Sequence, residues 1–142
     1  MRIYQAGPLF SEAECNWHKQ FKEKLESSGY EVVWPGELIT SDKLEAWGNE
    51  AARKIMETDR DALLSCDVVV ALLDGTQVDD GTAWEIGFAC AKGIPVIGIR
   101  TDFRHCGDTD SGKVNAMIQG SVCCIVKSGN EVLDELRKMR FN

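Results

Sequence analysis

The sequence has few basic residues and no long hydrophobic run. Lys and Arg total 16 against 23 Asp and Glu, so the formal net charge is −7. Such a chain lacks the basic surface that nucleic acids and anionic membranes attract. Its longest uncharged apolar run, residues 68–73, is too short to span a bilayer, and the first eight residues contain no apolar signal-peptide core. We therefore expect no nucleic-acid partner, no membrane partner and a cytoplasmic location.

Several motifs of catalysis and cofactor binding are also missing. There is no Gly-x-Ser-x-Gly elbow, no P-loop and no Gly-x-Gly-x-x-Gly after the first predicted strand. His18 is expected on a helix surface, and His105 with Cys106 is a poor metal site. The six cysteines form no Cys-x-x-Cys pair and several lie in apolar runs, so we expect reduced thiols. The sequence thus predicts neither a metal nor a cofactor.

Short β-rich runs alternate with amphipathic stretches along the whole chain. Strands are expected at residues 2–6, 31–34, 67–73, 94–99 and 121–126. Helices are expected after a capping box at Ser11, over residues 42–64 and 82–92, and near the C-terminus, where apolar residues recur from Val132 to Met139. Strand followed by helix, five times, predicts a single α/β domain over residues 1–142, with a parallel sheet covered by helices on both faces.

Ligands of such sheets bind beyond the carboxyl ends of the strands, which directs attention to the loop at residues 74–85. This loop carries four acids in twelve residues. Thr82 and Glu85 have the spacing of a capping box, in which Glu85 would only bond the backbone N–H of Thr82. The small residue Gly81 instead leaves room for a ligand. Both interpretations of Glu85 stay open at this point.

Asp59 is a second unusual acid, because it lies on or beside the apolar stripe of its predicted helix. An inward carboxylate is costly unless it is paired or used, whereas Asp61 falls on the outer face. Paired carboxylates at a pocket suit glycosidic chemistry, in which one attacks the anomeric carbon and another protonates the leaving group. A capped or salt-bridged acid at the edge of the core is the alternative for Asp59.

Four segments, residues 3–10, 66–71, 79–89 and 113–117, resemble the nucleoside 2-deoxyribosyltransferases. The most specific is the Asp-x-Gly-Thr-Ala-x-Glu-x-Gly element that begins at Asp79. The resemblance implies a flavodoxin-like, doubly wound, five-stranded sheet. It also implies 2′-deoxynucleosides and free nucleobases as substrates, and a homo-oligomer whose active sites are shared between chains. In such an enzyme a glutamate holds the sugar as an ester, and configuration is retained.

The resemblance also assigns roles by position. Glu85 matches the nucleophile, Tyr4 the residue that orients it, and Asp59 and Asp79 the acids that contact sugar or base and assist the leaving base. Asn115 matches a residue that reaches the 5′-hydroxyl from a neighbouring subunit. The remaining substrate-binding positions are Gly7, Phe10, Gly81 and Met117. A helix near Asn115 with only Val114, Met117 and Ile118 to bury also suggests packing on another subunit.

Two other functions are weighed against transfer. In the related 2′-deoxynucleoside 5′-phosphate N-hydrolases, serine and arginine side chains hold a phosphate. Here Asp79 takes the place of such a serine and would repel one. A non-catalytic receiver-like module could use Asp74, but it needs an acidic pair after the first strand, which is absent. The choice between purines alone and both base classes, the base-binding residues within 35–47, and the choice between dimer and hexamer stay open.

Overall fold

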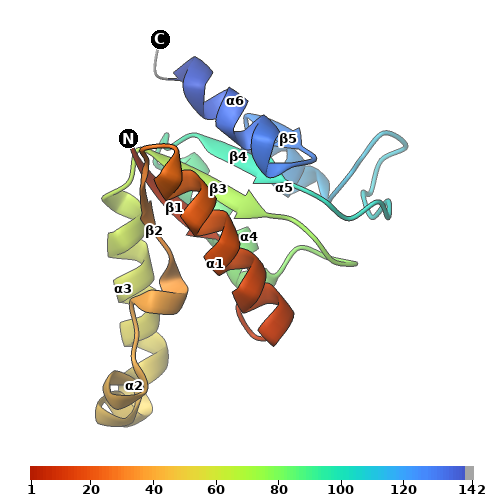
Figure 1. Cartoon of the computed structure of the whole chain (residues 1–142). Helices are drawn as coiled ribbons and strands as arrows, with labels where there is room; N and C mark the ends of the chain where they lie inside the picture. The colour runs from red at the N-terminus through yellow and green to blue at the C-terminus, as the bar shows by residue number, and fades with distance from the viewer. Residues whose placement is uncertain (140–142) are drawn as a thin grey trace.

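The fold is built on a five-stranded sheet in which every pair of neighbours is parallel (Figure 1). The computed structural model describes residues 1–139. The strand order is β2-β1-β3-β4-β5, which is the flavodoxin-like doubly wound order. The predicted fold class is therefore confirmed. The strands are β1 (Arg2–Ala6), β2 (Glu31–Val33), β3 (Val68–Leu72), β4 (Val96–Ile99) and β5 (Cys124–Val126).

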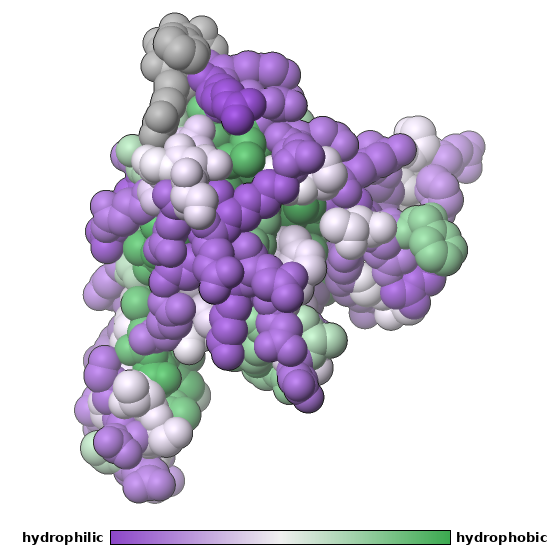
Figure 2. Space-filling model, in the orientation of Figure 1, coloured by the Kyte–Doolittle hydropathy of each residue, from purple (hydrophilic) through white to green (hydrophobic). Residues whose placement is uncertain are grey.

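Helices cover both faces because side chains alternate along the strands. In β1, Ile3 belongs to one core, with residues of α1 (Glu12–Ser27) and α6 (Gly129–Met139). Its neighbour Tyr4 belongs to the other, with residues of α3 (Ala51–Leu64) and α4 (Asp80–Ala91). The face carrying α1 and α6 is mostly hydrophilic outside, with apolar residues visible mainly between the elements (Figure 2). The shorter helices are α2 (Ser41–Trp47) and α5 (Ala116–Ser121), with 3₁₀ turns at Pro35–Glu37 and Gly48–Glu50.

Some predicted boundaries are wrong for local reasons. The helix expected over residues 42–64 is broken at Gly48, whose φ of 48° ends α2 and leads through a 3₁₀ turn into α3. Together with its ψ of −124°, this φ is a backbone conformation that glycine adopts far more readily than other residues. The strand expected from residue 121 begins at Cys124, since Ser121 still belongs to α5. The strand β1 and the capping box at Ser11 are as predicted.

The long connections lie at the carboxyl ends of the strands. The loops that follow β3 and β4 project together from this edge of the sheet (Figure 1). Within residues 1–139, no helix has the length and apolar character needed to cross a membrane. The candidate residues of the loop after β3 and of α4 therefore lie where parallel α/β sheets bind ligands.

Candidate functional site

Glu85 on α4 contacts Tyr4 in the middle of β1. The Tyr4 hydroxyl donates to Oε1 of Glu85 over 2.6 Å, across 81 residues of sequence. Tyr4 is completely buried. Its burial, with the neighbouring charge of Glu85, raises the pKa of the phenol above its ordinary value, so the hydroxyl keeps its proton. The contact expected between these two residues is thus present, and Tyr4 fixes one carboxylate oxygen of Glu85.

The environment of Glu85 favours its neutral form. Burial is the largest cause that raises its pKa, and the charges of Asp59 and Asp79 raise it further. The hydrogen bond from Tyr4 acts in the opposite direction, and the resulting pKa is about 7. A carboxyl group with this pKa exchanges its proton near neutral pH, as groups in active sites commonly do.

Asp59 on α3 supplies a second perturbed carboxyl group. Burial raises its pKa to about 6, and its Oδ1 is buried with no hydrogen-bond partner. Its charge acts on both Glu85 and Tyr4, so it faces the same region. By contrast, Asp61 is exposed and pairs with Arg60. The capped or salt-bridged alternative therefore does not describe Asp59.

The start of α4 decides between the two interpretations of Glu85. Asp79 is the N-cap residue, and its carboxylate accepts from the Thr82 backbone N–H and hydroxyl, both at 2.9 Å. Of the two interpretations, the capping box at Thr82 is therefore excluded, since Thr82 lies inside the helix and Glu85 bonds Tyr4 instead. Gly81 lies beside Asp79, and a Cβ there would meet Oδ2 of Asp79 at 3.3 Å.

The turn after β1 packs against the buried side chain of His18. His18 is completely buried, so the prediction of a surface role is wrong. The Gln5 amide nitrogen lies 2.8 Å from Nδ1 of His18 and donates to the His18 carbonyl at 2.9 Å. Because the amide donates to Nδ1, the proton of the neutral ring lies on Nε2. Burial lowers the pKa of His18 to about 4, and the ring stays neutral at physiological pH.

His18 restricts the residue at position 7. Gly7 has a φ of 154°, and a Cβ there would lie 2.6 Å from the His18 ring. We expect Gly7→Ala to cost roughly 2–4 kcal/mol of unfolding free energy, through overpacking and backbone strain. Urea unfolding measures it. The matched control is Gly87→Ala within α4, where a Cβ meets nothing within 4 Å, and this should be neutral or slightly stabilising. Equal effects of the two changes would contradict this account.

Phe10 lies at the other end of the same turn and is 81% exposed. Its backbone N–H donates to the Glu14 carboxylate at 3.0 Å, next to the capping box of α1. The turn therefore presents an aromatic ring to solvent at the carboxyl edge of the sheet.

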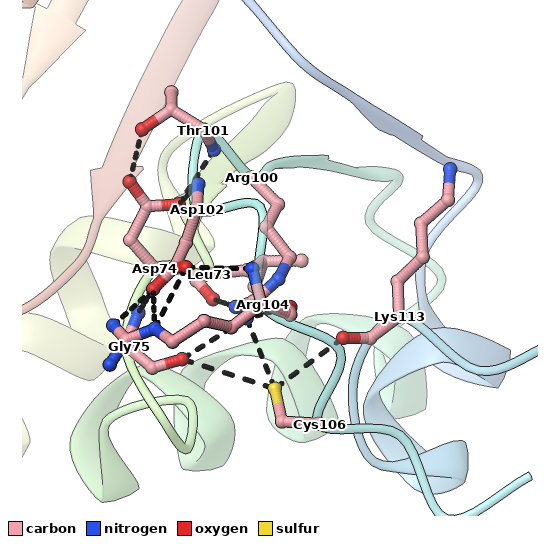
Figure 3. Close-up of polar contacts among 9 residues, drawn as sticks. All are labelled: Leu73, Asp74, Gly75, Arg100, Thr101, Asp102, Arg104, Cys106 and Lys113. Atoms are coloured by element: carbon pink, nitrogen blue, oxygen red, sulfur yellow. Dashed lines mark hydrogen bonds and ion pairs between the residues drawn. The ribbon is translucent and has the colours of Figure 1, made fainter.

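Arg100 joins the loop after β3 to the loop after β4 through hydrogen bonds (Figure 3). The sequence did not predict this role. Its buried guanidinium donates to the carbonyls of Leu73, Gly75 and Arg104. The Asp74 carboxylate accepts from the backbone N–H groups of Thr101 and Asp102, at 2.6 and 3.0 Å. Asp74 is thus engaged in loop structure, unlike the free acceptor that a receiver-like module requires. The only signal in the sequence is an arginine directly after an apolar strand.

Asn115 and Met117 lie at the start of α5. The Asn115 side chain caps this helix at the Met117 N–H and donates to Asp108 at 3.1 Å. Both residues line a cavity of about 610 Å³ between α4 and α5, whose lining does not include Glu85. Val114, which precedes α5, is buried in the same chain, whereas α5 itself contains no buried residue. Met117 remains 78% exposed.

No metal centre is evident within residues 1–139, where no three His, Cys, Asp or Glu side chains gather as a metal would require. All six cysteines are free thiols. Glu85 is the residue that links the candidate groups, since it accepts from the Tyr4 hydroxyl and its carboxyl group is influenced by the charges of Asp59 and Asp79.

The sequence model of the nucleoside 2-deoxyribosyltransferase family matches residues 3–117. A curated relative, the uncharacterized protein C191.05c of Schizosaccharomyces pombe, is 33% identical over 107 residues. The match covers 72% of this chain but 51% of the relative, so the chain spans about half the length of that protein.

Solved structures with the same fold include proteins of differing activity. A conserved protein from Enterococcus faecalis V583 superposes with a TM-score of 0.83 and 29% identity, covering 98% of each chain. The 2-deoxyribosyltransferase of Bacillus psychrosaccharolyticus has a TM-score of 0.77 and 24% identity, over 93% of this chain and 90% of that one. The CMP N-glycosidase BcmB of Clostridium botulinum has a TM-score of 0.61 and 22% identity, over 96% and 99%.

Proposed function

Because this chain belongs to the nucleoside 2-deoxyribosyltransferase family, we propose that it transfers the 2-deoxyribosyl group of a 2′-deoxynucleoside from one nucleobase to another. The observation that carries the proposal is the Glu85 carboxyl group, held by Tyr4 at 2.6 Å and perturbed by burial and by Asp59. This arrangement provides an oriented nucleophile and a nearby acid, the two groups that a retaining glycosidic reaction requires.

In the proposed first step, an ionised oxygen of Glu85 attacks C1′ as the bond to the base nitrogen breaks. The electron pair of that bond leaves with the base, and an acid provides the proton that the base takes up. The sugar is then held as an ester on Glu85. A second base attacks C1′ from the face that the first base left, so the configuration is retained and the carboxylate is released. A 2′-deoxy sugar stabilises the cationic transition state better than ribose does, since it has no 2′-hydroxyl to withdraw electrons.

In this proposal Asp59 and Asp79 have different roles. The buried, unpartnered Oδ1 of Asp59 suits the group that protonates the leaving base. Because the pKa of Asp59, about 6, lies below that of Glu85, about 7, the active form with the proton on Asp59 is the minor singly protonated form of the pair. Asp79 already accepts two hydrogen bonds from Thr82, so it holds α4 in place while facing the sugar. Tyr4 keeps one oxygen of Glu85 fixed while the other attacks.

The pH dependence follows from the two raised pKa values. At low pH both Glu85 and Asp59 are protonated, so no nucleophile is present. At high pH both are ionised, so no acid is present. With pKa values of about 7 and about 6, kcat/KM should describe a bell with its maximum between these values, and the two limbs belong to the coupled pair. Steady-state rates from pH 4 to 9 measure it, and a profile flat across this range would exclude the pair.

The test of transfer is incubation of the protein with deoxyinosine, with and without adenine. Transfer yields deoxyadenosine only when adenine is present. Hydrolysis yields hypoxanthine and free deoxyribose whether or not adenine is added. Release of no base at all would contradict both enzymatic functions. Parallel incubations with thymidine distinguish purine-only from broader base preference.

Hydrolysis of a nucleoside or nucleotide is the second candidate function. It shares the Glu85 ester, which water rather than a base would then attack. The carboxylate of Asp79 next to Glu85 disfavours a 5′-phosphate by charge repulsion. The turn of Gly7 and Pro8 also presents no cationic side chain to hold a phosphate.

We further propose a homo-oligomer in which Asn115 of one chain approaches the Glu85 site of its neighbour. Support comes from exposed apolar side chains near both sites, Met117 at 78% and Trp84 at 48%. In one chain Asn115 and Glu85 do not line a common cavity, and a second copy would bring them together.

Asn115→Ala should raise the KM for a deoxynucleoside by about 2–10-fold, since one neutral hydrogen bond to the 5′-hydroxyl is lost. Because Asn115 also caps α5, Asn115→Ser is the matched control. It preserves a capping oxygen but not the amide donor. Both variants should therefore show the raised KM, while only the alanine variant loses cap stability. A fully active monomer at assay concentration would contradict the shared site.

A further inference from the structure

A second cavity, of about 270 Å³, lies at the carboxyl ends of β4 and β5. Its lining does not include Tyr4, Asp59 or Glu85, and it contains one acid, Asp102. The cationic lining residues come from the β4–α5 and β5–α6 connections and are Arg100, Arg104, Lys113 and Lys127. In a chain with a net charge of −7, this is a local concentration of positive charge.

Of the cations in this region, only Arg104 is neutralised by an acid within residues 1–139. Arg104 pairs with Asp102, with Nε 2.9 Å from Oδ1. Asp74 accepts from the Thr101 and Asp102 backbone. The Arg100 guanidinium is buried, yet its partners are three carbonyls and the Cys106 thiol at 3.1 Å. No ion pair joins it to a carboxylate within residues 1–139. A buried guanidinium with no anionic partner leaves its charge to act on the adjoining cavity.

Lys113 and Lys127 add two ammonium groups without an ion pair in the described part of the chain. The carboxylate of Glu131 accepts from the backbone N–H of Lys127 at 3.2 Å and from the Ser128 hydroxyl at 3.1 Å, rather than pairing with the ammonium group of Lys127. Lys113 is extended, and its ammonium group makes none of the contacts drawn in Figure 3. Both side chains are therefore available to an anion.

The loop before Lys113 has the Gly-x₄-Gly-Lys spacing of a phosphate-binding loop but is not one. Val114 stands where Ser or Thr is required. The Asp108 carboxylate accepts from the Ala116 N–H at 2.7 Å, so it occupies the helix N-terminus that would otherwise face a phosphate. Lys113 is thus the part of this loop that serves the basic cavity.

We infer that this basic cavity binds the phosphate group of a small phosphorylated molecule, with Lys113 and Lys127 as direct ligands and Arg100 as a fixed charge beneath them. A phosphate dianion matches the surplus of positive charge better than a single carboxylate does. The cavity also has apolar wall from Ile125 and from Phe103, whose ring is 93% exposed. This wall suits the organic part of a phosphate monoester. The inference goes beyond the proposed glycosyl transfer and does not depend on it.

The test is a ¹H–¹⁵N NMR titration at constant ionic strength, with inorganic phosphate, phenyl phosphate and phenol as probes. We expect saturable shifts of the Thr101, Lys113 and Lys127 amides, with Tyr4 and Glu85 unmoved. Phenyl phosphate should bind more tightly than inorganic phosphate if an ester is the natural ligand. Equal affinity would assign the cavity to the free ion, and either result supports a phosphate site. Phenol should cause no saturable shift.

Lys113→Gln and Lys127→Gln should each weaken phosphate binding about tenfold, the effect of losing one charged hydrogen bond. The matched control is Lys19→Gln, on the exposed surface of α1, which should leave the affinity unchanged. Circular dichroism verifies that each variant is folded. The inference is overturned if the shifts do not saturate, if they centre on Glu85, or if Lys19→Gln weakens binding as much as Lys127→Gln.

Discussion

Replacing Glu85 with glutamine is expected to lower the rate of base release from deoxynucleosides by at least about 10³-fold, as loss of a covalent nucleophile does. The amide has nearly the same shape and can still accept from the Tyr4 hydroxyl, which lies 2.6 Å from Oε1. The fold and substrate binding should therefore survive. Steady-state release of hypoxanthine from deoxyinosine measures the loss, and full activity in this variant would exclude Glu85 as the nucleophile.

The same substitution has a predicted effect on stability. The folded-state pKa of Glu85, about 7, lies above its ordinary value of 4.5. The stability that it contributes is therefore complete below pH 4.5 and is lost as the pH rises through 7. Glutamine cannot ionise, so the variant avoids this loss. The change in unfolding free energy caused by Glu85→Gln should therefore be more favourable at pH 8 than at pH 4, by roughly 2–3 kcal/mol. If Glu85 acted only as a helix cap, its substitution would instead lower the free energy of unfolding by about 1 kcal/mol.

Asp59→Asn should produce the second-largest effect, a fall in kcat of about 10²–10³-fold with little change in nucleoside binding. Asparagine cannot protonate the leaving base, and general acid catalysis contributes on this scale. The matched control is Asp61→Asn on the same helix, because Asp61 is exposed and pairs with Arg60. It should keep full activity. Equal losses in both variants would show a general effect on α3 rather than a role for the Asp59 carboxyl group.

Substrates with better leaving groups separate these roles further. A base that departs without protonation should restore much of the rate of Asp59→Asn, since it no longer requires an acid. It should not restore the rate of Glu85→Gln, because the amide has no carboxylate oxygen to attack C1′. Restoration of both variants to the same degree would contradict the division of labour between the two carboxyl groups.

Local patterns were sufficient to predict much of the fold. The strand Arg2–Ala6 and the Ser11 capping box depend on adjacent residues, and both are present as predicted. The alternation of strands and helices was enough for the parallel sheet, because short crossovers leave few topologies. The break at Gly48 could not be placed, since the apolar spacing continues across it from Leu44 to Ile55.

The candidate site depended more on contacts distant in sequence. The pattern from Thr82 to Glu85 favoured a capping box and an active-site carboxylate equally, and only the position of Tyr4, 81 residues away, distinguishes them. Burial of His18 depends on Gly7 leaving space for its ring. The bonds of Arg100 to Leu73 and Gly75 join two loops that no local pattern connects. Such pairings are set by tertiary packing, which a single sequence does not display.

The most direct test of the central claim is intact-protein mass spectrometry after rapid acid quench, with deoxyinosine present and no acceptor base. The proposal predicts a species heavier by one 2-deoxyribosyl group, with the added mass on the peptide that contains Glu85. The species should be absent in Glu85→Gln and should disappear when adenine is added, as deoxyadenosine forms. Base release with an adduct on another residue, or with none at any quench time, would contradict the covalent role of Glu85.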